Sequence, residues 1–134
     1  MALWASFIFY MSSRTSESLQ IDKDGIGAIS VWFHNLVSNV FNVDPSFGDV
    51  IAHTTEYTIL GALLVNALIF HIKEQRAVGL AFTACIFYAF SDELHQLFFS
   101  AGRTFQLQDL VCDTLGALLG IAIVMCILKL VKKR

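Results

Sequence analysis

The chain has little charge, almost no proline and few cysteines. Only 15% of its 134 residues are charged, whereas soluble domains carry about 25% charged residues. This scarcity argues against a soluble enzyme, a disordered segment and a basic nucleic-acid-binding protein. With 8 glycines and 1 proline, it is no linker either. The whole chain is 56% hydrophobic and has a mean hydropathy of +0.65. This composition is typical of a small membrane protein with several spans.

The three cysteines, Cys85, Cys112 and Cys126, lie inside apolar runs and form no close pair. This spacing predicts no disulfide framework and favours buried free thiols that act as small hydrophobic residues. The N-terminus has no basic region ahead of its apolar stretch, so we expect no cleavable signal peptide.

Three apolar runs are long enough to cross a bilayer: residues 51–72, 77–99 and 109–131. At about 1.5 Å per residue each reaches about 33–35 Å, more than a hydrocarbon core of about 30 Å. Residues 1–13 reach only about 20 Å, which predicts a short first span that thins the bilayer or leans on its neighbours. We therefore expect an all-α membrane protein, a bundle of four transmembrane helices forming one domain over residues 1–134.

The segment between the first and second spans predicts a further helix outside the bilayer. Apolar residues recur at helical spacing from Ile29 to Phe41, with serine, histidine and asparagine on the other side. This pattern predicts an amphipathic, extracytoplasmic helix that lies in the membrane interface or caps the bundle. Asp44 and Pro45 are then typical of the N-cap and first turn of a new helix.

The basic residues predict the orientation of the bundle. Six of them fall on one side of a chain with four spans: Lys73, Arg76, Lys129, Lys132, Lys133 and Arg134. The other side has Arg14, Lys23 and Arg103. The positive-inside rule then places both termini in the cytoplasm. Nearly all acidic residues fall on the outer side, where they contribute little to orientation and point instead to an outward-facing polar site.

Ionisable groups from three predicted helices share one depth in the outer leaflet. They are His53 and Glu56 on the second span, Asp92 and His95 with Tyr88 and Gln96 on the third, and Asp109 and Asp113 on the fourth. Helical spacing places each set on one face, while Glu93 is expected to point away, toward the headgroups. Gly116 and Gly120 continue the face of Asp113 and would let a neighbouring helix approach closely.

A charge inside a span costs at least about 2.5–3.5 kcal/mol, so such a group indicates a function by default. The structural alternative is that Arg103 neutralises Asp109 or Asp113 and that His53 hydrogen-bonds to Glu56. Arg103, the one cation near this site, suits a phosphate or carboxylate. A weaker alternative is a mixed nitrogen and oxygen metal site formed by His53, Glu56, Asp92, His95, Asp109 and Asp113. We expect no cofactor and no metal.

Three motifs carry a resemblance to a known family: AHTTEYTILGALL at 52–64, FSDELHQLF at 90–98 and GRTFQLQDLVCDTLGALLG at 102–120. They resemble the VanZ-like family of bacterial integral membrane proteins, and the N-terminal FIFYMSS is similar to that family's first span. The resemblance covers nearly the whole chain. It implies the signature positions His53, Glu56, Tyr57, Asp92, Glu93, His95, Gln96, Gly102, Arg103, Asp109, Asp113 and Gly116. At Asp113 the family uses either aspartate or asparagine.

The resemblance implies a multi-pass protein of the bacterial cytoplasmic membrane, in a family named for a member linked to teicoplanin resistance. The first functional hypothesis is binding of an anionic lipid-linked cell-wall precursor or phospholipid, or action against a glycopeptide antibiotic at the membrane surface. The expected ligand-binding residues are His53, Glu56, Asp92, His95, Gln96, Arg103, Asp109 and Asp113.

The second hypothesis is an enzyme that hydrolyses or transfers a group on such a lipid. Glu56 or Asp92 would act as base, His95 as proton shuttle and Arg103 as anion stabiliser. No nucleophile motif accompanies them, so the sequence leaves catalysis open. A transporter is a third reading, which the lack of an inverted repeat weakens.

Overall fold

The computed structural model describes residues 2–12, 45–99 and 105–133, and in these ranges all regular structure is helical. The helices are α1 (Ala2–Ser12), α4 (Pro45–Ile69), α5 (Glu74–Phe99) and α6 (Leu107–Lys132). The helix expected between Ile29 and Phe41 lies outside the described residues, as do Gly102 and Arg103. α4 begins at Pro45, as predicted, and the same helix continues as the second apolar run.

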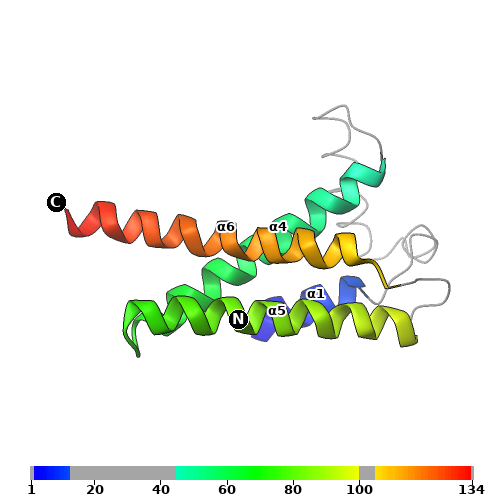
Figure 1. Ribbon diagram of the computed structural model, residues 1–134, viewed down its shortest axis with the longest axis horizontal. Helices are drawn as coiled ribbons and strands as arrows, with labels where there is room; N and C mark the ends of the chain where they lie inside the picture. Colours follow the sequence, from blue (N-terminus) through cyan, green and yellow to red (C-terminus); the bar gives the residue numbers. More distant parts are fainter. Residues whose placement is uncertain (1, 13–44, 100–104, 134) are drawn as a thin grey trace.

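The long helices α5 and α6 run antiparallel along one direction (Figure 1). α4 packs on both α5 and α6 and runs obliquely to them, and α1 lies against α4 and α5. One end of the bundle, here called the site end, holds the end of α5 and the start of α6. The opposite end, here called the basic end, holds the turn between α4 and α5 and the end of α6, where Glu74 pairs with Lys132.

Small residues bring the backbones of α4 and α6 into close contact. A Cβ atom added at Gly116 would strike the Thr54 carbonyl, and one at Gly120 would strike the Thr58 carbonyl. At Gly61 the added atom would lie 2.5 Å from the carbonyl oxygen of Ala117. The predicted close approach at Gly116 and Gly120 is therefore confirmed, and only glycine fits at these crossings.

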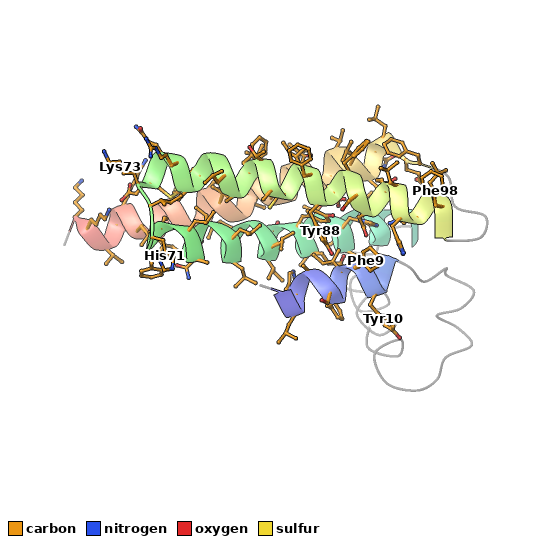
Figure 2. All side chains as sticks on the ribbon, turned by 90° about the horizontal axis from the view of Figure 1, so that it is seen from below. Phe9, Tyr10, His71, Lys73, Tyr88 and Phe98 are labelled. Carbon is orange, nitrogen blue, oxygen red and sulfur yellow. The ribbon has the colours of Figure 1, made fainter. Side chains whose placement is uncertain are left out.

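The short first helix leans on its neighbours. Trp4 Nε1 donates a hydrogen bond to the Glu56 carbonyl at 3.0 Å, and the Tyr88 hydroxyl donates to the Ala5 carbonyl. Ile8 is buried in the same core as Tyr57 and Cys85. With its 11 residues, α1 reaches only about 17 Å, so it covers the half of the bundle nearer the site end. Figure 2 shows Phe9 of α1 close to Tyr88 of α5.

Two of the described helices, α5 and α6, are long and apolar enough to cross a membrane by length and composition. α4 has 25 residues but does not meet the same test, because polar side chains such as His53, Thr54 and Glu56 fill its first half. Cys85 is buried as expected, whereas Cys126 is exposed. The expectation of a buried thiol at Cys126 is wrong, because this residue lies on the outer face of α6.

Candidate functional site

Polar side chains from α4, α5 and α6 meet inside the bundle near the site end. We call this group the polar cluster: His53, Glu56, Tyr57, Asp92, Glu93, Gln96, Asp109 and Asp113. Five of its members, Tyr57, Asp92, Glu93, Gln96 and Asp113, are each at most 1% exposed. Burying charged groups so completely is costly unless each one is paired or hydrogen-bonded, so the partners of these groups define the site.

One contact links α4 to α6 directly. His53 Nδ1 lies 3.2 Å from Asp113 Oδ1, with the two side chains 13% and 1% exposed. His53 also interacts electrostatically with Asp109 and Glu56. Of the groups that the structure describes, it is therefore Asp113 rather than Glu56 that hydrogen-bonds to this imidazole. The close packing at Gly116, one turn further along α6, brings Asp113 within reach of α4.

Glu56 and Tyr57 bring the second helix into contact with α5 as well as α6. Glu56 interacts electrostatically with His53, Asp113 and Asp92, and Tyr57 with Asp113, Asp92 and Glu56. Tyr57 is completely buried. These interactions place groups from all three long helices within electrostatic range of one another, at the common depth that the sequence predicts. Because α4 begins at Pro45, Glu56 is about 16 Å along the helix, deeper than a start at residue 51 implies.

Glu93 lies inside the bundle, so the expectation that it points away is wrong. Its side chain is fully buried, and its Oε2 accepts a hydrogen bond of 2.9 Å from the backbone N–H of Gln106. Glu93 also interacts electrostatically with Asp109, His53 and Asp113. The physical reason is that α5 packs against three helices at once, and so buries an arc wide enough for two consecutive positions that differ by about 100°.

The other polar side chains of α5 fall on two sides of this arc. Gln96 Nε2 donates to Asp92 Oδ2 at 3.4 Å, one turn away on the same helix. His95 packs its ring on Phe9 of α1, with centroids 4.0 Å apart. The predicted polar face of α5 therefore divides: Asp92 and Gln96 belong to the buried cluster, while His95 meets the short first helix.

Several buried polar atoms of the cluster have no hydrogen-bond partner among the described residues. They are the Tyr57 hydroxyl, Glu93 Oε1 and Asp113 Oδ2. Leaving such an atom unsatisfied costs about 1–3 kcal/mol. No three His, Cys, Asp or Glu side chains within residues 2–12, 45–99 and 105–133 are arranged to hold a metal ion. Each of these unsatisfied oxygen atoms can accept a hydrogen bond from a donor.

Sequence reasoning missed three contributors to the site. Trp4 and Phe9 of α1 contact Glu56 and His95, and the backbone of Gln106 holds Glu93. An aromatic residue in an apolar run gives no sign of its partner, and a backbone donor leaves no trace in the sequence at all. Arg103, the predicted anion-binding residue, lies outside the described residues, and its role stays a prediction.

Comparison with known proteins gives one match. The model of the VanZ/LLP1 family matches residues 1–129, which includes α1, α4, α5, all but the last three residues of α6 and every predicted site residue. No curated protein and no solved structure matches the chain. The family match therefore rests on almost the whole sequence, and the evidence for a chemical role lies in the polar cluster.

Proposed function

Because this chain belongs to the VanZ-like family, we propose that it holds an anionic lipid-linked or cell-envelope ligand at the polar cluster. Family membership and the apolar helices α5 and α6 identify it as a membrane protein. The observation that carries the proposal is the convergence of fully buried Asp92, Glu93 and Asp113 from two helices near one end of the bundle. Stability alone seldom favours several buried ionisable groups, which mark binding or transport sites in membrane proteins.

In this proposal the site end faces outward, and Arg103 binds the phosphate of the ligand. A planar guanidinium holds phosphate by two parallel hydrogen bonds. The ligand is a phospholipid or a lipid-linked cell-wall precursor in the outer leaflet, and its capture contributes to tolerance of teicoplanin. The contact of His53 with Asp113 keeps the two helices of the site in register.

The test compares a strain that has the protein with one that lacks it. We expect Glu56→Gln, Asp92→Asn and Arg103→Lys each to abolish the teicoplanin phenotype while protein abundance stays the same. The amides keep size but remove charge, and lysine keeps charge but loses the planar fork. Loss of phenotype only in proportion to lost abundance would mean that the cluster is structural, which would refute the proposal.

A second candidate is an enzyme acting on the same lipid, and one observation favours it. An imidazole held by a carboxylate, as His53 is by Asp113, is an arrangement that orients a general base. A nucleophile would also be needed, and Ser91 lies next to Asp92. The Ser91 hydroxyl, however, donates a hydrogen bond to the Tyr88 carbonyl on an exposed part of α5. Lipid analysis separates the two candidates, because a new or missing lipid species requires catalysis and unchanged lipids with drug tolerance require binding.

A further inference from the structure

The described part of the polar cluster is rich in carboxyl groups and has no lysine or arginine. Five carboxyl groups lie toward the site end: Glu56, Asp92, Glu93, Asp109 and Asp113. Every lysine and arginine in the described ranges lies at the basic end instead: Lys73, Arg76, Lys129, Lys132 and Lys133. In the proposed function Arg103 binds the phosphate of the ligand, because a phosphate placed among ionised acids would be repelled. The acids are suited instead to a positively charged part of the same ligand.

The unsatisfied atoms of the cluster also favour a ligand with hydrogen-bond donors. Glu93 Oε1 and Asp113 Oδ2 are completely buried and have no partner among the described residues. A carboxylate oxygen only accepts hydrogen bonds, so each of these atoms needs a donor. The buried Tyr57 hydroxyl, also without a partner there, interacts electrostatically with Asp113 and supplies a third acceptor that does not depend on the acids.

We infer that the ligand of the polar cluster carries a primary ammonium group, which hydrogen-bonds to Glu93, Asp113 and Tyr57. This inference rests on the proposed function and adds to it: the ligand has an ammonium group as well as a phosphate. An ammonium group has three N–H donors and no acceptor, which matches three unsatisfied acceptors in number and sign. An ammonium group is a compact point charge whose three donors can turn toward three separate acceptors, whereas a guanidinium holds its donors in one planar fork.

The depth of the cluster agrees with a headgroup that has both charges. Glu93 lies six residues before Phe99 and Asp113 six residues after Leu107, which places both about 9 Å from the site end. His53 and Asp109 are partly exposed and adjoin the buried acids. In this inference the ammonium group enters past these two residues while the phosphate stays nearer the headgroup level.

The experiment measures lipid binding by native mass spectrometry of the full chain released from detergent micelles. Phosphatidylethanolamine carries phosphate and ammonium, phosphatidylglycerol carries phosphate alone, and N-acetylated phosphatidylethanolamine has lost the ammonium charge. We expect phosphatidylethanolamine to bind at least about tenfold more tightly than the other two, a difference of about 1.4 kcal/mol, because only its ammonium group can form charged hydrogen bonds with the cluster. Free phosphoethanolamine is a competitor that separates a lipid headgroup from a soluble ligand of the same chemistry.

Two variants locate the effect in the cluster. Glu93→Gln keeps an acceptor for the Gln106 N–H but removes the charge, and we expect the preference for the amine to fall to about twofold or less. Glu74→Gln is the matched control, since it removes a carboxylate at the basic end and should leave the preference unchanged. The wild-type comparison of the three lipids needs no variant, so misfolding of Glu93→Gln would not hide the answer.

Each outcome has a distinct meaning. Equal binding of the three lipids, or tighter binding of phosphatidylglycerol, overturns the ammonium inference and leaves the proposed function intact. Binding of none of the phosphate lipids overturns both. A preference for the amine that survives in Glu93→Gln also overturns the inference, because the ammonium group then lies outside the cluster.

Discussion

At the scale of single residues, the contact of His53 with Asp113 joins α4 to α6 and can be tested as a pair. The two atoms are 3.2 Å apart and the carboxylate is 1% exposed, so removing either partner leaves the other poorly solvated. We expect a double-mutant cycle of His53→Ala and Asp113→Ala to give a coupling free energy of about 1–3 kcal/mol. Reversible unfolding in detergent measures it.

The control for this cycle pairs His53→Ala with Glu74→Ala at the basic end, which should be additive within about 0.5 kcal/mol. Additivity of His53→Ala with Asp113→Ala would contradict the contact. A result of that kind would also weaken the case for an oriented base in the second candidate function.

Glu93 is the second residue whose role can be measured. Its carboxylate accepts the Gln106 N–H at the entry to α6, so Glu93→Ala should speed hydrogen exchange in the first turn of that helix. Ser91→Ala is the matched control, since its hydroxyl bonds only to its own helix at Tyr88. Protection of the first turn of α6 that is unchanged in Glu93→Ala would show that the hydrogen bond does not hold this helix end.

Shared depth and helical spacing predicted most of the cluster from the sequence. Glu56, Asp92 and Asp113 were expected together, and the packing of α4 on α5 and α6 places Glu56 within electrostatic range of both aspartates. The error at Glu93 has a physical cause, because a helical wheel assumes one buried face and α5 contacts three other helices. Which acid pairs with His53 depends on how α4 crosses α6, and that is a tertiary property.

At the scale of helices, the crossing of α4 and α6 is the contact least tolerant of change. We expect Gly116→Leu to lower the free energy of unfolding by at least about 1–3 kcal/mol, because an added Cβ meets the Thr54 backbone. Gly79→Leu is the matched control, since nothing lies within 4 Å of its added Cβ. Similar melting temperatures for the two variants in detergent would mean that the helices do not touch at Gly116.

The helix bounds followed from apolar runs, with differences at the ends. The run at 77–99 became Glu74–Phe99 and the run at 109–131 became Leu107–Lys132, because helices extend past the hydrophobic core until a turn ends them. α4 ends at Ile69 rather than at residue 72. A turn follows it, in which the His71 N–H donates a hydrogen bond to the Leu68 carbonyl. Apolar periodicity reports burial in lipid or protein and says little about where the last hydrogen bond forms.

At the scale of the whole molecule, charge is separated along the bundle. Described lysines and arginines gather at the basic end, where His71 and Lys73 lie far from Phe98 (Figure 2), and the buried acids gather toward the site end. The positive-inside rule predicts that the basic end is cytoplasmic, and we then expect the polar cluster to lie toward the outer leaflet. The proposed ligand depends on this orientation, because lipid-linked cell-wall precursors and glycopeptides would reach the protein from the outer side of the membrane.

The orientation can be measured by labelling single cysteines in intact cells, after Cys85, Cys112 and Cys126 are replaced by alanine. Gln108 at the start of α6 and Gln75 at the start of α5 are both exposed and lie at opposite ends of the bundle. We expect Gln108→Cys to react with a membrane-impermeant thiol reagent and Gln75→Cys to react only after the cells are opened. Reversed labelling would place the polar cluster toward the cytoplasm. The ligand would then have to come from the inner leaflet, and an outward-facing site for cell-wall precursors would be refuted even if the amine preference held.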